Sequence, residues 1–399
     1  MVQPVRLCRK MKKLHIVLFA LILFAFSACG PKAGNDYIVA AYVWPSCHDD
    51  SLGRALLWPD GRGEWEIIER GTPMFEGHYQ PRQPLWGQLP DDDPQVVERW
   101  IQTALKYGVN TFIYDWYWFH HYPFLEGALD NGFLKAPSNR KMNFFIMYAN
   151  HEVTNYWNPY INSDKETLTM DPRIDWDQWK IIVDRVITQY FHLPNYLKFD
   201  GKPVFGLYDP QMFVESFSTL EEAGKAMDYF RDEVRKAGFK GLYVTQHSGM
   251  FKVPNTWWEN RTQTNADALG LDAYAFYNMA SRDEDYMEYS RRGVEWRDLW
   301  EKRFSDRPIF PTASIGWDNQ PRYPGEDVVI CRYNNTPEAF AASVQSAKEY
   351  ADAHVATQPK MILLNAWNEW VEGSYLLPDR LYGYQYLEAV RDVLEGKYE

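Results

Sequence analysis

Two glutamates, Glu369 and Glu372, stand three residues apart, just after an apolar run over residues 361–366. Hydrolysis of a glycosidic bond normally requires two carboxyl groups, one protonated to assist the leaving oxygen and one ionised to act as base or nucleophile. Residues three apart point the same way only where the chain follows a helical turn, and Gly373 allows a sharp bend directly afterwards. The stretch therefore predicts a buried strand that ends in an acid/base pair.

Aromatic and amide side chains surround the two glutamates. Trp367 and Trp370 flank Glu369, and desolvation by such neighbours raises the pKa of a carboxyl group. Asn365 and Asn368 could orient sugar hydroxyls. The chain also holds 27 Tyr and 17 Trp, whose apolar faces and polar edges suit carbohydrate. Two structural alternatives remain open, an acidic cluster before the next helix and an aromatic-rich core without a ligand.

Eight strand-like segments alternate with helical patterns along the chain, and only the stretch between the fifth and sixth strands lacks a helical pattern. Asp93-Pro94 and Thr336-Pro337 begin two of the predicted helices. Such alternation implies a parallel sheet, and eight repeats imply a closed (β/α)8 barrel in one large α/β domain. A doubly wound open sheet is the alternative, but no Gly-rich phosphate loop follows any strand. The predicted strands are 38–43, 110–117, 143–150, 203–208, 241–246, 266–272, 309–314 and 361–366, and further helices are predicted at 176–190, 220–237, 283–303 and 384–395.

Polar or aromatic residues follow at least six of the eight strands. In a barrel of this kind the active site lies at the carboxyl ends of the strands. One such residue alone would more often be a cap or a loop residue, but their joint occurrence favours a ligand-binding face. With Glu369 and Glu372 as the catalytic pair, we expect the substrate to contact Asp115, Tyr117, His151, Glu152, His247, Tyr277, Trp317, Asp318, Asn368 and Trp370.

The cysteines and histidines show no metal-ligand spacing. The nine histidines are scattered, and the adjacent pair His120-His121 cannot face one ion from an extended segment. We therefore expect neither a metal nor an organic cofactor. Cys47 and Cys331 could form one disulfide in an oxidising compartment, although spacing alone does not say whether they meet.

The first 28 residues are typical of a signal peptide. Five Lys and Arg residues lie between positions 6 and 13, and the apolar run over 14–26 is too short to span a bilayer. Ser27-Ala28-Cys29 resembles a bacterial lipobox, which predicts cleavage before Cys29 and acylation of its thiol. We expect an exported protein anchored by lipid to a bacterial membrane, most simply the outer membrane, with residues 29–36 as a short tether and 37–399 as the catalytic domain. Ordinary secretory cleavage and an N-terminal membrane anchor are the alternatives.

The mature chain is strongly acidic. Without the five basic residues of the leader, the formal net charge of -12 becomes -17. An acidic surface disfavours nucleic acid and anionic membranes as partners. The expected partner is an oligosaccharide or polysaccharide, with membrane contact through the lipid anchor only and no nucleotide.

Three stretches of the chain resemble a known family. The run NAWNEWVEGSY from Asn365, which ends in Leu377-Pro378-Asp379, looks like the signature of the WbsX-like proteins, a group related to glycoside hydrolase family 99. YQPR from Tyr79 with YDWYWF from Tyr114, and GWDNQPR from Gly316, agree with it in the expected order. Together the resemblance covers about residues 38 to 395.

Family 99 enzymes are (β/α)8 barrels that cleave internal α-mannosidic linkages with retention through a 1,2-anhydro sugar. The resemblance implies that Glu369 assists the substrate's 2-hydroxyl as base, while Glu372 serves as general acid and then as base. Val371 replaces the residue commonly seen between them, and this difference concerns the specificity for mannose more than the mechanism. An alternative mechanism uses Glu369 as acid and either Asp318 or Asp272 as nucleophile across the barrel.

The WbsX-like group has also been labelled glycosyltransferase. A transferase of the usual kind needs a nucleotide-sugar donor, which is not expected outside the cytoplasm, so the predicted export favours a hydrolase. The third alternative is a surface lipoprotein that binds a glycan without cleaving it. Binding alone needs no carboxyl pair, and the sequence therefore predicts a lipid-anchored glycoside hydrolase.

Overall fold

The computed structural model describes residues 36–161, 164, 166–248, 256–278, 285–323 and 331–398, without the side chains of 256–260. Residues Asn35–Glu399 form one compact unit. The expected signal peptide, Cys29 and nearly all of the tether lie outside the described residues. Among the residues that are described, none of the helices is both long enough and apolar enough to cross a membrane.

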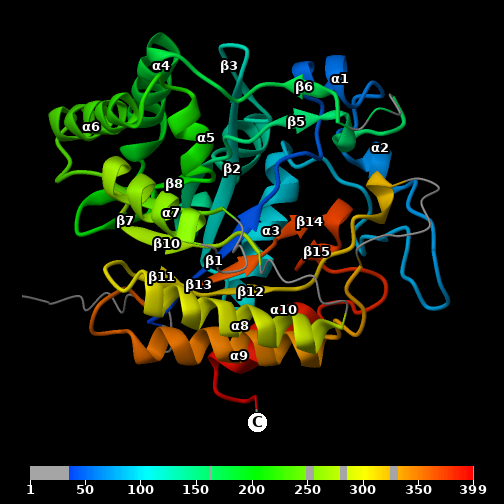
Figure 1. The fold of residues 1–399 in the computed structure, drawn as a ribbon. Helices are drawn as coiled ribbons and strands as arrows, with labels where there is room; N and C mark the ends of the chain where they lie inside the picture. The colour runs from blue at the N-terminus through cyan, green and yellow to red at the C-terminus, as the bar shows by residue number, and fades with distance from the viewer. Residues whose placement is uncertain are drawn as a thin grey trace, which may run out of the picture. The chain divides into compact units, whose positions relative to one another are not determined.

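Eight parallel strand positions close into a barrel (Figure 1). The seventh position is divided at Pro311, which has no N–H to donate to a ladder. Its first part, β11 (Ile309–Phe310), pairs with β10, and its second part, β12 (Thr312–Ser314), pairs with β13 (Met361–Asn365). β13 pairs in turn with β1 (Ile38–Val43), which closes the ring and confirms the predicted fold. The intervening strands, in order, are β2 (Thr111–Phe119), β4 (Asn143–Tyr148), β8 (Lys202–Leu207), β9 (Tyr243–Gln246) and β10 (Ala273–Ala275).

Helices form the outer layer of the barrel, and α8 and α9 lie next to each other in Figure 1. Asp93 and Thr336 cap α3 and α9 as predicted, because their side chains accept from the N–H groups of Gln95 and Ala339. After β2 the chain forms a hairpin with β3 (Tyr122–Phe124) and a short π-helix, Ala128–Phe133, in place of a regular helix. The α-helices are α1 (Ser51–Leu56), α2 (Trp65–Ile68), α3 (Pro94–Lys106), α4 (Trp176–Val186), α5 (Pro210–Glu215), α6 (Leu220–Lys236), α7 (Thr256–Leu269), α8 (Tyr286–Arg303), α9 (Pro337–Ala353) and α10 (Gln385–Leu394).

The sixth strand differs from its prediction. The predicted strand 266–272 overlaps the end of α7, although no helix was expected in this stretch. The sixth strand itself is β10, which begins directly after the predicted range. The helix has a weak amphipathic pattern, so its period is hard to recognise in the sequence. Asp272 therefore precedes the strand and lies at its amino end, where its carboxylate accepts from the N–H of Val244 at 2.8 Å. It cannot act as a nucleophile at the carboxyl ends.

The other seven predicted strands are present, with ends that shift by at most two residues. In β2, which is buried on both faces, side chains alternate between the barrel interior and the outer layer. Trp116 and Trp118 point outward, and Trp118 donates to Gln178 of α4. Asp115 and Tyr117 consequently point inward, toward the carboxyl end of the barrel.

Candidate active site

Glu369 and Glu372 lie on a tight turn after β13. The chain continues through β14 (Asn368–Glu369), a 3₁₀-helix over Trp370–Glu372, and β15 (Ser374–Tyr375). A 3₁₀-helix has three residues per turn, so side chains three apart lie on one side. Gly373 follows with φ 64°, a conformation that favours glycine. Both carboxyl groups consequently line one cavity of about 190 Å³.

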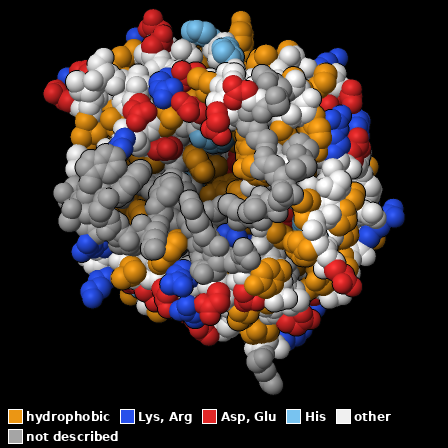
Figure 2. All heavy atoms as spheres, turned by 45° about the vertical axis from the view of Figure 1, so that its right-hand side comes forward, with side chains coloured by type: hydrophobic (Ala, Val, Ile, Leu, Met, Phe, Trp, Pro, Cys, Tyr) orange, Lys and Arg blue, Asp and Glu red, His pale blue; other side chains and the backbone are white. Residues whose placement is uncertain are grey.

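The wall of this cavity is largely aromatic. Figure 2, in which the side of β14 and β15 comes forward, shows a hollow with hydrophobic side chains inside it and acidic side chains beside it. Five of the predicted substrate-contacting residues do line the cavity, namely Asp115, Tyr117, His151, Tyr277 and Trp317. They come from four different strand positions, which is how a barrel assembles a site.

Arg322 links the glutamate pair to a third buried carboxyl group. Its Nη1 donates to Oε1 of Glu372 at 2.8 Å, and its Nη2 donates to Oε1 of Glu64 at 2.8 Å. Glu64 is fully buried and also accepts from Ser46 and Trp44. Because a charged donor fixes each carboxylate, the side chain of Glu372 is held in one orientation.

The two glutamates differ in their electrostatic surroundings. Burial raises the pKa of Glu372 to about 7, although Arg322 opposes the rise and Glu64 adds to it. Among the described residues no cation bonds Glu369, which accepts instead from the hydroxyl of Tyr277 at 2.5 Å. Burial, and then the charge of Glu372, raises the pKa of Glu369 well above its usual range. Because Arg322 bonds Glu372 and favours its ionised form, Glu369 is the member of the pair that more readily keeps a proton.

His151 is a neutral hydrogen-bonding group of the cavity. Its Nδ1 donates to the backbone carbonyl of Glu152 at 3.1 Å, so its Nε2 is free to accept from the hydroxyl of Tyr117 at 3.2 Å. Burial lowers the pKa of His151 to about 4. At neutral pH it supplies no positive charge to the site.

Five of the residues predicted to contact the substrate do not line the cavity, and Glu152 and His247 are two of them. Glu152 is exposed and pairs with Arg173 at 3.1 Å. His247 is buried deeper in the barrel, between the hydroxyl of Tyr42 at 2.7 Å and that of Thr245 at 2.6 Å. Burial lowers the pKa of His247 to about 3, so it acts as a neutral support beneath the site. The expectation of direct substrate contact is corrected for both.

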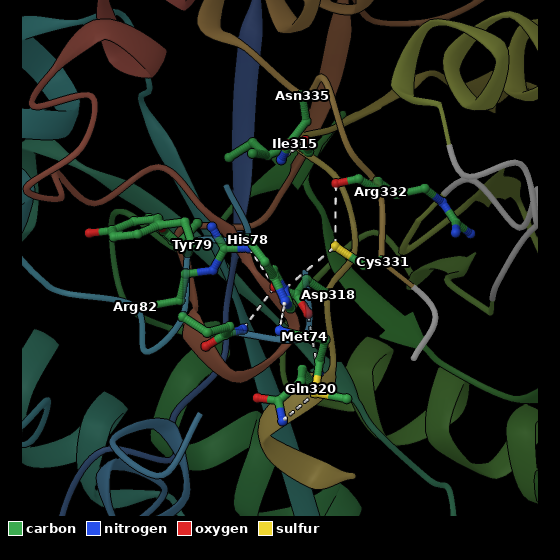
Figure 3. A network of polar contacts seen from close by, with 12 residues as sticks. Met74, His78, Tyr79, Arg82, Ile315, Asp318, Gln320, Cys331, Arg332 and Asn335 are labelled. Atoms are coloured by element: carbon green, nitrogen blue, oxygen red, sulfur yellow. Dashed lines mark hydrogen bonds and ion pairs between the residues drawn. The ribbon is translucent and has the colours of Figure 1, made fainter. Parts of the chain in front are cut away.

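Asp318 lies behind the turn that carries Glu369 and Glu372 rather than in the cavity. Its Oδ2 accepts from His78 at 2.9 Å, Gln80 at 2.8 Å and Arg82 at 2.7 Å (Figure 3). Burial alone would raise the pKa of Asp318, but these three donors hold it below its usual value. Its backbone N–H donates to the carbonyl of Glu372 at 2.7 Å. Asp318 thus anchors the turn, which corrects both its expected place at the substrate and its alternative role as nucleophile.

Asn368 and Trp370 also support the turn from behind. The side chain of Asn368 accepts from the N–H of Trp44 at 2.8 Å and donates to its carbonyl at 2.7 Å. Trp370 stacks on Tyr375, with 3.9 Å between the ring centroids. Both side chains are buried, and neither lines the cavity of the two glutamates as the sequence had suggested.

His78, Asp318 and Cys331 form a group of potential metal ligands among the described residues. The N–H of Met74 donates to Nδ1 of His78 at 3.1 Å, so the ring hydrogen is on Nε2, the atom that faces Asp318. That nitrogen donates to Asp318 and has no lone pair for an ion, while Arg82 occupies the same carboxylate oxygen. The group is therefore a closed hydrogen-bond network (Figure 3).

A second cavity, of about 310 Å³, adjoins this network. Its polar side chains are largely committed within the protein, as with Asn335, which donates to Ile315, and Tyr386, which donates to Asn335. Cys331 lines this cavity, and it does not form the suggested disulfide with Cys47.

Several residues of the site were not predicted. Arg322 belongs to the GWDNQPR stretch but had no assigned role, and Glu64 precedes a short helix without any distinguishing pattern. Tyr208 directly follows β8, so the strand-end criterion could have included it. Other unpredicted lining residues are Trp44, Met147, Ala149, Tyr156, Trp157 and Asn278.

Comparison with known proteins agrees with this architecture. Two sequences named "Uncharacterized protein WxcX", from two strains of Xanthomonas campestris pv. campestris, are 25% identical over 378 residues, which is 91% of this chain and 50% of theirs. The chain thus spans about half the length of the curated relatives it matches.

Solved structures share the fold. A glycoside hydrolase-like protein superposes with a TM-score of 0.58 at 17% identity, over 90% of this chain and 94% of the other. The family 99 endo-α-mannosidase from Bacteroides thetaiotaomicron gives 0.55 at 11% identity, over 90% and 96%. Residues 39–390 match the family described as glycosyltransferase WbsX, and the chain therefore belongs to the WbsX family.

Proposed function

We propose that the protein is a glycoside hydrolase acting on a complex glycan, with Glu369 and Glu372 as its catalytic carboxyl groups. The observation that carries this proposal is the asymmetry of the pair: Arg322 bonds Glu372, whereas Glu369 accepts from the uncharged hydroxyl of Tyr277. Two carboxyl groups with different protonation in one cavity are the chemical requirement for glycoside hydrolysis. A glycan-binding protein without turnover would not need such a pair.

The substrate and mechanism that fit best are an α-mannoside and retention through a 1,2-anhydro sugar. Support comes from the family 99 resemblance of the turn and from the shared fold of an endo-α-mannosidase. In this mechanism Glu369 is the base toward the substrate's 2-hydroxyl and Glu372 is the general acid and then the base. Because the proton of the empty site rests on Glu369, these roles require that substrate binding transfers it to Glu372.

A glycosyltransferase is the second candidate, because the family carries that description. A nucleotide-sugar donor would bring a diphosphate into the cavity. Arg322 is the one basic side chain among the described lining residues. Both of its terminal nitrogens already bond carboxylates. The diphosphate would face Asp115, Glu369 and Glu372 without an available cation, which favours the hydrolase.

Export on a lipid anchor at Cys29 is part of the same proposal. The basic and apolar leader and the Ser27-Ala28-Cys29 site support it, and an exported enzyme would not meet nucleotide sugars. Replacing Cys29 by Ala should move the protein from the membrane fraction to the soluble fraction and abolish its labelling by palmitate. Retention of both properties in the variant would refute the anchor.

The direct test is a substrate screen with the purified protein. It would be incubated with α-mannan fragments and with other plant and host glycans, and new reducing ends would be measured. Glu372→Gln should lower turnover by orders of magnitude while glycan binding persists. Product from a nucleotide-sugar donor instead of hydrolysis would establish the transferase, and binding without either reaction would establish the non-catalytic alternative.

A further inference from the structure

Asp115 is a third carboxyl group of the cavity, and it is surrounded differently from the glutamate pair. It lies on β2, lines the cavity, and is only 5% exposed. Its Oδ1 is buried and has no hydrogen-bond partner in the described part of the protein. A carboxylate oxygen in that position would be costly, because burial removes water without supplying a donor.

Four tyrosines lie close enough to Asp115 to interact with it electrostatically. Each could donate its hydroxyl hydrogen to an ionised Asp115 only if that hydrogen is not donated elsewhere. They are Tyr42, Tyr117, Tyr208 and Tyr277. A phenol has one hydrogen to donate and otherwise only accepts.

Three of these four hydrogens are used elsewhere. Tyr277 donates to Glu369, and Tyr117 donates to Nε2 of His151. The hydroxyl of Tyr42 contacts Nδ1 of His247 at 2.7 Å and the carbonyl of Phe276 at 3.3 Å. Its hydrogen goes to one of these two acceptors, so only Tyr208, or Tyr277 if its hydrogen turned away from Glu369, could donate to an ionised Asp115.

The charges near Asp115 also disfavour ionisation. Glu372 is negative above about pH 7, and Arg322 is bonded to Glu372 and Glu64 rather than to Asp115. Burial raises the pKa of Asp115 well above its usual range; hydrogen bonding to Tyr277 opposes this rise only in part, and Glu372 adds to it. Asp115 therefore stands at the cavity wall as a carboxylic acid.

We propose that Asp115 binds the substrate as an uncharged carboxylic acid, donating its hydrogen to an oxygen of an uncharged sugar. This inference rests on the proposed function and narrows its substrate class to neutral glycans. A carboxylate, sulfate or phosphate group on the bound sugar would lie near Glu372 and would find no unpaired cation among the described lining residues.

The pattern of substitutions at Asp115 tests the proposal. An amide N–H₂ also donates, so Asp115→Asn should retain kcat/KM on the best neutral glycan of the screen within about fivefold. Asp115→Ala cannot donate and should lose about tenfold to a hundredfold, mainly through KM. Asp115→Leu is a second non-donating variant of similar volume, and thermal unfolding of every variant checks that it folds.

Two outcomes would overturn the proposal. If Asp115→Asn loses activity by the orders of magnitude expected for Glu372→Gln, Asp115 works in its ionised form. If Asp115→Ala and Asp115→Leu both match the native protein, Asp115 does not contact the substrate.

A spectroscopic measurement does not depend on turnover. The infrared difference spectrum between the native protein and Asp115→Asn, without ligand at pH 7.5, should contain the carbonyl band of a protonated carboxylic acid. A carboxylate band in its place would refute the protonated state. If no glycan is cleaved the proposed hydrolase fails, whereas the protonation state of Asp115 is still decided by this spectrum.

Discussion

Glu372 and Arg322 are joined by a 2.8 Å hydrogen bond between two buried side chains, at the wall of a cavity that they share with Glu369. Arg322 gives Glu372 a fixed orientation and favours its ionised form. Glu369, three residues earlier on the same turn, accepts from the uncharged hydroxyl of Tyr277 and more readily keeps a proton. The difference between two otherwise identical side chains therefore comes from one arginine.

The pH dependence of activity should follow the pKa of Glu372. If the active form of the pair holds one proton, kcat/KM rises as the pH increases through about 7, where the second proton leaves. Arg322 lowers this pKa, so Arg322→Met should raise it and move the acidic limb of the profile to higher pH. Arg235→Met, on the exposed side of α6, is the matched control and should leave the limb in place. An acidic limb that moves to lower pH in Arg322→Met would contradict the role of the ion pair.

The separate roles of the two glutamates can be tested with an α-mannosyl fluoride, whose leaving group needs no acid. In Glu372→Gln the first step on the fluoride, measured as the initial burst of fluoride release, should stay within about tenfold of the native rate, although turnover of the glycan falls by orders of magnitude. Glu369→Gln should lose activity on both, because the base toward the 2-hydroxyl is missing. If Glu369→Gln releases fluoride at nearly the native rate and Glu372→Gln does not, the two glutamates have the opposite roles.

Glu369→Gln should also make the protein more stable at alkaline pH. The pKa of Glu369 is raised by folding, so the folded state keeps a proton that the unfolded chain releases above its ordinary pKa. Stability is therefore lost as the pH rises, whereas glutamine has no such dependence. The variant should unfold at a higher temperature than the native protein at pH 8 and at nearly the same temperature at pH 4.5. Glu221→Gln, at an exposed position of α6, should show no difference at either pH.

Replacing Asp318 should loosen the turn that carries Glu369 and Glu372. Asp318→Asn removes the charge that accepts from His78, Gln80 and Arg82, and breaking a buried ion pair costs about 3–5 kcal/mol of unfolding free energy. Because the pKa of Asp318 is lowered in the fold, its contribution is present at neutral pH and disappears as the pH falls. Chemical denaturation at two pH values measures both effects. Asp232→Asn, which breaks an exposed pair with Arg235, should cost less than about 1 kcal/mol; an equal loss in both variants would argue against the network.

Gly373 and Gly383 provide a matched pair for the geometry of the turn. Both have positive φ, 64° and 58°, so alanine at either position costs about 1 kcal/mol of backbone strain. A Cβ at Gly373 would lie 3.0 Å from Nη2 of Arg82 and 3.0 Å from Cβ of Asp318, whereas one at Gly383 meets nothing within 4 Å. Gly373→Ala should therefore lose about 1–3 kcal/mol more stability than Gly383→Ala, together with turnover. Similar stability and activity in the two variants would show that the turn tolerates displacement.

The sequence by itself determined the features that depend on residues close together in the chain. Alternating strand and helix patterns, with caps at Asp93 and Thr336, were sufficient for the barrel, because each repeat is a local unit. The turn that presents Glu369 and Glu372 was also predictable, since the pair and Gly373 lie within five residues of one another. The sixth strand was misplaced because α7 has too weak an amphipathic pattern to be distinguished locally.

Only the tertiary structure decided which distant side chains meet. Arg322 is 50 residues from Glu372 and 258 from Glu64, and closure of the barrel brings all three together. Strand ends with similar composition were indistinguishable in the sequence, yet Asp115 faces the cavity while Asp318 faces a buried network behind it. Asp115 points inward because it lies within β2, whereas Asp318 follows β12 and its direction is set by the packing of neighbouring loops.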